Sequence, residues 1–241
     1  MPDWNLPVGV RALQTECGMG TAPYGGFNLG DHVGDDAAQV ARNRQRLLQA
    51  IGASPIWLNQ VHGTAVCALT PVTTVPVEAD AALTEQRGLA CTIMTADCLP
   101  VLIADRQARV VGAAHAGWRG LLGGVLEALL AALTAVPGVK RRDLTVWLGP
   151  AIGPTVFEVG PEVRAAFVTL NPAYDQWFKS LTDCAGKYLA DLPGLARTIL
   201  QQAGVEDVTL SGLCTVSLPN RFYSYRRDGV TGRMASLIWL E

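Results

Sequence analysis

The chain has no large excess of charge of either sign and no block of basic residues. Its 19 lysines and arginines nearly balance 21 aspartates and glutamates, so the net charge is -2. Proteins that bind nucleic acid through its phosphate backbone need a basic field, which this composition does not supply. We therefore expect no nucleic-acid partner, and we expect any phosphate group to be bound locally by a few residues.

The sequence also lacks a hydrophobic run long enough to cross a membrane. Glycines, Glu127 and Pro137 interrupt its most apolar stretch, residues 121–139. The uninterrupted part is too short for a bilayer core of about 30 Å. The first residues show neither the basic start nor the apolar segment of a signal peptide. These absences predict a cytoplasmic protein without a membrane partner.

The sequence has no closely spaced pair of cysteines and few histidines. None of the six cysteines belongs to a CxxC motif. A chain of this length does not depend on disulfides for stability, so we expect reduced thiols. Only three histidines occur, His32, His62 and His115.

What is present is a series of short segments bounded by turn-forming residues, with no internal repeat. The segments rich in β-branched and aromatic residues predict strands at 56–58, 91–95, 101–104, 109–114, 144–148, 208–210, 222–225 and 235–240. Helices are expected near 36–51, 121–136, 160–170 and 189–203. Because the strands cluster in pairs, the pattern favours a mixed α/β (α+β) protein over a Rossmann arrangement, in one domain spanning 1–241.

Two polar residues interrupt the apolar face of the first predicted helix. Asn43 and Arg44 lie on the same stripe as Val40 and Leu47. Polar side chains on an inward face need partners. They either bridge to neighbouring backbone or point into a site, and the pattern alone slightly favours the first interpretation.

Two of the histidines and one cysteine lie beside glycine-rich turns. They are His62 in Asn59-Gln60-Val61-His62-Gly63, Cys98 after Asp97, and His115 before Ala116-Gly117-Trp118-Arg119-Gly120. Imidazole and thiolate are zinc ligands, and three protein ligands with one open position are typical of a catalytic zinc site. The trio predicts such a site. His32 is either a further polar group there or a loop residue.

A hairpin would bring two of these residues together. If residues 105–108 form a four-residue connection, Ala104 pairs with Arg109 and Cys98 lies directly opposite His115. Pro100 cannot donate a ladder hydrogen bond, so it indicates an edge position or the end of regular pairing.

The turn after His115 leads into a helix and carries Arg119. Such a turn presents free N–H groups, and an arginine adds a fork of donors, so phosphate is an expected ligand there. Asp97 either orients an imidazole from behind or serves a turn.

Several long motifs, in order, resemble those of the YfiH-like family, also called the laccase-domain, polyphenol oxidase or peptidoglycan-editing-factor family. They include Asn28-Leu29-Gly30-Asp31-His32-Val33-Gly34-Asp35-Asp36, Thr95-Ala96-Asp97-Cys98-Leu99-Pro100, His115-Ala116-Gly117-Trp118-Arg119-Gly120 and Tyr225-Arg226-Arg227-Asp228-Gly229-Val230-Thr231-Gly232-Arg233-Met234. The resemblance extends over nearly the whole chain.

The resemblance implies β-sheets packed together and flanked by helices, with Zn²⁺ held by His62, Cys98 and His115. It implies phosphorolysis of adenosine, inosine and methylthioadenosine, and adenosine deamination. Expected substrate contacts are Asn43, Arg44, Gln60, Asp97 and Arg119, with Arg226 or Arg227 reaching the same pocket. Purine nucleoside and phosphate would be the small-molecule partners.

The early part of the chain departs from the family pattern. Where family members generally carry Thr-Thr-Arg-x-Gly-Gly, this sequence reads Thr15-Glu16-Cys17-Gly18-Met19-Gly20. The family's arginine is missing. Affinity or substrate choice would change if that arginine binds phosphate or substrate, and Cys17 could enter the pocket in its place.

Three other functions compete with a zinc-dependent nucleoside enzyme. Cys98 could act as a nucleophile, with a histidine as base, in the hydrolysis of peptidoglycan precursors. Copper-dependent phenol oxidation ranks lower, because one cluster cannot supply several copper sites, although copper could bind such ligands. A binding module with a structural metal would need a fourth protein ligand.

Overall fold

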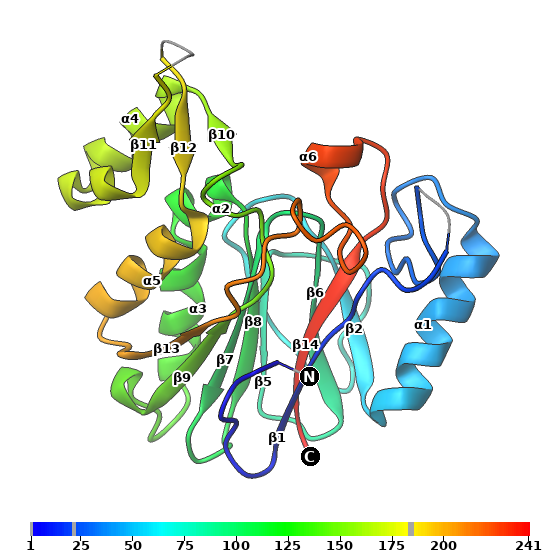
Figure 1. The fold of residues 1–241 in the computed structure, drawn as a ribbon. Helices are drawn as coiled ribbons and strands as arrows, with labels where there is room; N and C mark the ends of the chain where they lie inside the picture. The colour runs from blue at the N-terminus through cyan, green and yellow to red at the C-terminus, as the bar shows by residue number, and fades with distance from the viewer. Residues whose placement is uncertain (1, 21–22, 183–185) are drawn as a thin grey trace.

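Two β-sheets lie face to face at the centre of the molecule, and helices cover their outer faces (Figure 1). The computed structural model describes residues 2–20, 23–182 and 186–241. The six-stranded sheet has the order β13 (Asp207–Leu210), β9 (Leu144–Leu148), β7 (Leu99–Asp105), β8 (Val111–Ala116), β5 (Ala81–Thr84), β3 (Val66–Ala68). The five-stranded sheet has the order β1 (Val10–Gln14), β14 (Met234–Leu240), β6 (Leu89–Thr95), β2 (Ser54–Asn59), β4 (Val77–Glu78).

The helices and a small third sheet complete the structure. The helices are α1 (Ala37–Ile51), α2 (Trp118–Gly123), α3 (Val125–Thr134), α4 (Pro161–Leu170), α5 (Leu192–Gln202) and α6 (Tyr225–Asp228), with 3₁₀ turns η1 (Arg141–Asp143) and η2 (Pro172–Trp177). The small sheet joins β10 (Glu158–Val159), β12 (Tyr188–Ala190) and β11 (Phe178–Ser180). This architecture confirms the predicted mixed α/β class with packed sheets.

Residue alternation along β7 explains why helices and a second sheet cover its two faces. Val101 and Ile103 belong to the core formed with α3 and α5. Leu102 and Ala104 face the five-stranded sheet. Because both faces are covered, the strand is apolar throughout, as is typical of a central strand.

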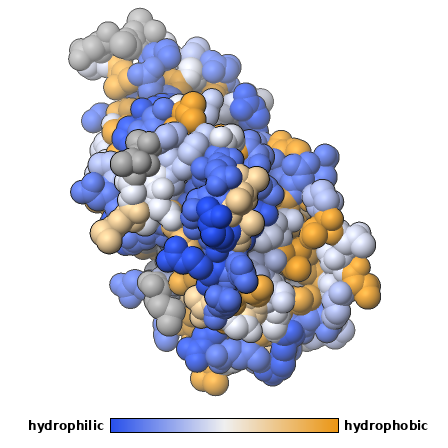
Figure 2. Space-filling model, turned by 90° about the vertical axis from the view of Figure 1, so that its right-hand side faces the viewer, coloured by the Kyte–Doolittle hydropathy of each residue, from blue (hydrophilic) through white to orange (hydrophobic). Residues whose placement is uncertain are grey.

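Helix α1 covers the outer face of the five-stranded sheet. Asp36 caps it by accepting a hydrogen bond from the N–H of Ala38, and Gly52 ends it at a φ of 66°. Leu47 packs in a core with strand residues such as Leu237. The opposite face of α1 is exposed, and Figure 2 shows that this side of the molecule is largely hydrophilic.

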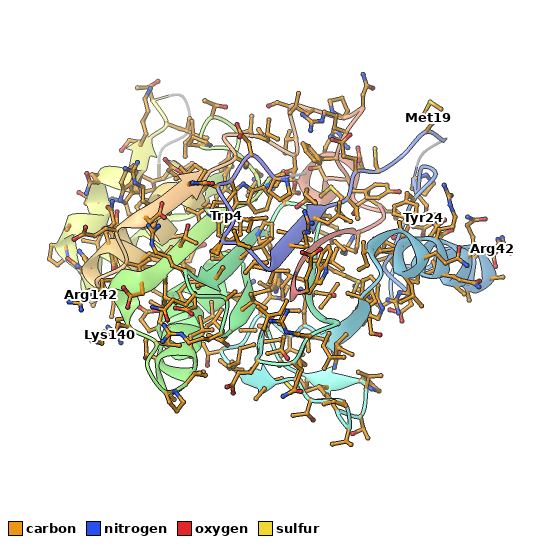
Figure 3. All side chains as sticks on the ribbon, turned by 90° about the horizontal axis from the view of Figure 1, so that it is seen from below. Trp4, Met19, Tyr24, Arg42, Lys140 and Arg142 are labelled. Atoms are coloured by element: carbon orange, nitrogen blue, oxygen red, sulfur yellow. The ribbon has the colours of Figure 1, made fainter. Side chains whose placement is uncertain are left out.

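The N-terminal segment is anchored between the sheets. Trp4 is almost fully buried and its indole N–H donates to Thr145 Oγ1 at 2.9 Å. Figure 3 shows Trp4 near the middle of the molecule, whereas Arg42 lies at one side and Lys140 and Arg142 at the other. These basic side chains are dispersed, in keeping with the near-zero net charge.

Three local predictions are wrong. In the β7–β8 hairpin, Ala104 pairs with Val111, and Pro100 pairs with His115. Residues 121–136 are not one helix, because Gly124 at a φ of 95° separates α2 from α3. Residues 222–225 are not a strand, because Phe222 closes a turn onto Leu218 and α6 starts at Tyr225.

In the described part of the chain, no helix combines the length and apolarity needed to span a membrane. Cys184 lies outside the described residues.

Candidate metal centre

The structure brings His62, Cys98 and His115 together. Their ligand atoms lie within 4.8 Å of one another, and they are the one such group of three or more found among the described residues. Cys98 Sγ is 3.7 Å from His62 Nε2, and the two imidazole rings meet edge to face with centroids 4.7 Å apart. His115 is buried, Cys98 is half-buried and His62 is exposed.

The three residues come from both central sheets. His62 follows β2, Cys98 immediately precedes β7, and His115 lies near the end of β8. The observed register places Cys98 beyond the last pair of the hairpin, next to the turn at Gly117. A Cβ atom on Gly117 would lie 2.9 Å from the His62 ring and 3.0 Å from Cys98 Sγ. Glycine is therefore needed there to leave the cluster room.

A fully buried carboxylate, Asp80, organises two of the three ligands. Its Oδ1 lies 2.8 Å from His115 Nδ1, which leaves His115 Nε2 for the cluster. The same carboxylate accepts the backbone N–H groups of Val61, His62 and Gly63 at 2.6–3.1 Å. These bonds hold the turn in which His62 takes a φ of 62°. A carboxylate behind a ligand imidazole is a common feature of metal sites.

Asp97 has different hydrogen-bond partners from Asp80. Its Oδ1 accepts the hydroxyl of Thr215 at 2.6 Å, and its Oδ2 accepts the hydroxyl of Ser224 and the N–H of Arg226. Asp97 thus ties the Cys98 loop to the segment leading into α6. Of the two roles considered for Asp97, the structure supports the turn role, and Asp80 is the carboxylate behind the imidazole.

The cluster favours an anionic sulfur. Burial by itself raises the pKa of the Cys98 thiol, but hydrogen bonds to His115 and His62, together with their charges, lower it to about 6. Burial by itself lowers the pKa of His115, but Asp80 and Cys98 raise it to about 9. The lowered pKa of Cys98 favours the thiolate, which is the form of cysteine that binds metals.

Two cavities meet at this cluster. The first, which we call the Arg233 cavity, measures 380 Å³. The second, the Arg119 cavity, measures 300 Å³. Of these two cavities, the Arg233 cavity alone is lined by His32, Gln60, Met94, Thr95, His115 and Arg233. The Arg119 cavity alone is lined by Asp97, Trp118, Arg119, Ile152, Phe157, Leu192 and Arg226. Both cavities are lined by His62, Ala96, Cys98 and Tyr225, so the cluster stands where they join.

The arginines expected at the site differ in their placement. Arg119 is exposed, with its guanidinium 4.4 Å from the Trp118 ring centroid, and it forms no hydrogen bond with another described residue. Arg226 lines the same cavity, over the ring of Phe157. Arg227 instead donates to the carbonyl groups of Thr215, Val216 and Phe222 and lines a separate cavity.

The other expected substrate contacts are largely engaged within the protein. Asn43 is buried and donates to the carbonyl of Asn28. Arg44 pairs with Asp31 at 3.0 Å and stacks on Trp57 in an adjoining cavity of 200 Å³. Gln60 lines the Arg233 cavity, but its amide makes two hydrogen bonds to the backbone of Met94.

The early segment that departs from the family pattern lies apart from the cluster. Cys17 is buried and lines a cavity with Met19 and Tyr223 that contains none of the three proposed ligands. Burial raises the pKa of its thiol.

Sequence reasoning gave no role to Asp80, Thr95 or Arg233. The detectable signal for Asp80 is a single acid directly before the apolar run Ala81-Ala82-Leu83.

Fold and site together define a mixed α/β protein with a His₂Cys cluster at the junction of two cavities. Residues 11–241 match the family model described as multi-copper polyphenol oxidoreductase laccase, and the chain belongs to this family, which includes the YfiH proteins. The chain is 49% identical to a purine nucleoside phosphorylase of Pseudomonas aeruginosa, covering 100% of this chain and 97% of that protein. It is 45% identical to the purine nucleoside phosphorylase YfiH of Escherichia coli K12, covering 100% and 98%.

Solved structures agree with this membership. The crystal structure of Neisseria meningitidis protein NMB0706 superposes with a TM-score of 0.92 at 45% identity, covering 99% of this chain and 97% of that one. YlmD from Geobacillus stearothermophilus gives a TM-score of 0.87 at 31% identity, covering 97% and 93%.

Proposed function

We propose that this protein is a zinc-dependent purine nucleoside phosphorylase that acts on adenosine, inosine and methylthioadenosine, and that the same site deaminates adenosine. The observation that carries the proposal is the convergence of His62, Cys98 and His115 where two cavities join. The full-length identity to proteins named purine nucleoside phosphorylase supports the choice of substrate class.

The donor set fits zinc. Two imidazoles and one thiolate are ligands that zinc prefers, and three protein ligands leave a position for a reactant. The tie from Asp80 to His115 Nδ1 supports binding through Nε2. When bound, zinc would act as a Lewis acid that polarises an oxygen or activates water.

In the proposed phosphorolysis, a phosphate oxygen forms a bond to ribose C1′ while the bond from C1′ to the purine nitrogen breaks. The products are ribose 1-phosphate and the free base, which takes up a proton. The protein's part is to orient both reactants at the cluster and to balance the phosphate charge with arginine. Trp118 and Phe157 offer aromatic walls for the purine in the Arg119 cavity.

In the proposed deamination, water adds at purine C6 and ammonia leaves, so adenosine becomes inosine. Both reactions use one nucleoside site. The presence of phosphate then decides whether free base appears among the products.

Metal analysis and product identification test this function. We expect about one zinc per chain, adenine from adenosine only when phosphate is present, and inosine in its absence. Cys98→Ala and His115→Ala should lower both activities by at least about 100-fold, whereas Cys67→Ala, a change of the same kind on β3, should leave them intact. Full activity in a zinc-free protein would overturn the proposal.

A second function has one observation in its favour. The pKa of Cys98, lowered to about 6 by its two histidines, is suited to a cysteine nucleophile that cleaves a peptidoglycan precursor. Covalent trapping at Cys98 that persists after zinc removal would support this reaction over phosphorolysis.

A further inference from the structure

Arg233 is the one arginine that lines the Arg233 cavity, and no carboxylate in the described part of the chain pairs with it. Arg44 and Arg109, in contrast, pair with Asp31 and Asp105. Arg233 Nη1 donates to the carbonyl oxygens of Thr231 and Gly232, both at 3.0 Å. Its Nε and Nη2 have no partner among the described residues, so these donors are available to a ligand in the cavity.

The guanidinium of Arg233 is held in place. Its backbone N–H donates to Asn28 Oδ1 at 2.8 Å, and its carbonyl accepts the N–H of Leu29. A Cβ atom on Gly30 would lie 2.8 Å from Cγ of Arg233, so the glycine makes room for the arginine stem. Burial lowers the pKa of the guanidinium below its usual value, against the charges of Cys98, Asp97 and Tyr225. A partly buried, fixed cation that forms no salt bridge with a described carboxylate favours an anionic ligand.

A second group in the same cavity also lacks a partner. Thr95, the last residue of β6, is 2% exposed, and its hydroxyl forms no hydrogen bond with the described residues. Leaving a buried hydroxyl unpaired costs free energy. Thr95 lines the Arg233 cavity, where a ligand could complete its hydrogen bonding.

We propose that the Arg233 cavity binds the phosphate that acts as co-substrate, through the guanidinium of Arg233 and the hydroxyl of Thr95, and that the nucleoside occupies the Arg119 cavity. This assignment rests on the proposed phosphorolysis. It places phosphate away from Arg119, although the glycine-rich turn that carries Arg119 predicts phosphate binding there.

The contrast between the two cavities supports this division. Arg119 is exposed and lies on Trp118, where water screens its charge. Its cavity has the apolar walls Ile152, Phe157 and Leu192, which suit a purine nucleoside better than a small dianion. Because both cavities reach Cys98 and His62, the phosphate oxygen and ribose C1′ would meet at the cluster.

The test compares Arg233→Gln with Arg119→Gln in the zinc-loaded protein. Initial rates of base release from inosine are measured while phosphate and nucleoside are varied separately. Arg233→Gln should raise the KM for phosphate about 10- to 100-fold and change the KM for inosine less than about twofold. Arg119→Gln should leave the KM for phosphate near its wild-type value. The reverse pattern would overturn the assignment.

Thr95 gives an independent comparison should Arg233→Gln fail to fold. Thr95→Val removes the hydroxyl at nearly constant shape and should raise the KM for phosphate about 5- to 10-fold, whereas Thr95→Ser should restore it. Equal phosphate KM values in the Val and Ser variants would contradict the role of the hydroxyl.

Calorimetric titration of inorganic phosphate into the protein distinguishes the proposed phosphate site from the proposed phosphorolysis. If Arg233→Gln binds phosphate more weakly than the wild type, but the wild type releases no base, phosphorolysis is refuted and the anion site is retained. If the wild type releases base and Arg233→Gln binds phosphate with unchanged affinity, phosphorolysis is retained and the assignment of the anion site to Arg233 is refuted.

Discussion

Asp80 holds more parts of the site in position than any of the proposed ligands does. Four donors converge on its two oxygens, three from the backbone of residues 61–63 and one from His115 Nδ1. These bonds, with burial opposing them, hold the pKa of Asp80 below its usual value. Since every neighbour is a donor, only an ionised carboxylate can satisfy them all.

Replacing Asp80 by Asn should weaken metal binding while the metal-free protein still folds. The amide offers one acceptor oxygen and turns its NH₂ group toward N–H donors, so the His62 turn and the His115 ring lose their orientation. We expect zinc affinity to fall about 10- to 100-fold, measured by competition with a coloured chelator.

Glu78→Gln is the matched control for that change. It removes the same charge two positions away, from an exposed residue of β4. Its zinc affinity should equal that of the wild type. A comparable loss of affinity in both variants would show that Asp80 acts through net charge and not through orientation.

At the residue scale, the sequence predicts the His62, Cys98 and His115 cluster that the structure brings together, but it gives no role to the acid behind His115. Asp97 adjoins Cys98 in the sequence, whereas Asp80 lies 35 positions before His115 in the chain. Such a partner becomes visible only when β5 and β8 pair, which places Ala81 opposite Ala114. Thr95 and Arg233 were hidden for the same reason, since strand pairing sets β6 and β14 side by side.

At the scale of elements, the turn of the β7–β8 hairpin shows how side chains set a register. Asp105 is fully buried and its carboxylate accepts two hydrogen bonds from the Arg109 guanidinium, each at 2.7 Å. Ala108 takes a φ of 53° to close the turn. Arg109 is therefore part of the connection and not of the strand. The predicted register was wrong by two residues because composition does not reveal this interaction.

The Asp105–Arg109 pair should stabilise the protein at neutral pH. Arg109, together with backbone N–H groups, outweighs burial and holds the pKa of Asp105 below its usual 3.8. A depressed carboxyl pKa contributes stability above the usual value and loses it as the pH falls through the lower, folded-state value. Asp105→Asn should lower the free energy of unfolding by about 1–3 kcal/mol at pH 7, measured by urea denaturation.

The difference between wild type and Asp105→Asn should shrink as the pH drops below about 3.8. The control is Asp207→Asn, which breaks an exposed ion pair with Arg106 of the same turn. Exposed pairs contribute about 0–1 kcal/mol, so this variant should remain close to the wild type. A difference for Asp105→Asn that persists unchanged at pH 2.5 would contradict the linkage.

At the scale of the whole molecule, the candidate metal centre connects the two central sheets. His62 follows a strand of the five-stranded sheet and His115 lies within the six-stranded one, while Cys98 sits on the chain segment that passes between them. The mixed α/β class could be predicted from segment patterns, and the packing of the sheets from the resemblance to the family. The two cavities could not, because their walls combine loop residues with residues of separate strands and helices, and tertiary contacts such as those of Asp97 set how these parts lie together.

A metal bound across the two sheets should stabilise the whole fold, because unfolding would separate its ligands. A ligand present at 100 to 1,000 times its Kd stabilises the native state by about 2.7–4.1 kcal/mol. For a chain of this size, that corresponds to a shift in Tm of about 5–15 °C. We therefore expect a chelator to lower the Tm of the zinc-loaded protein by this amount in calorimetry. Cys98→Ser should lose most of the shift, whereas Cys67→Ser should keep it, since Cys67 lies on edge strand β3. An equal chelator effect in both variants would place the stabilising metal somewhere other than the His62–Cys98–His115 cluster.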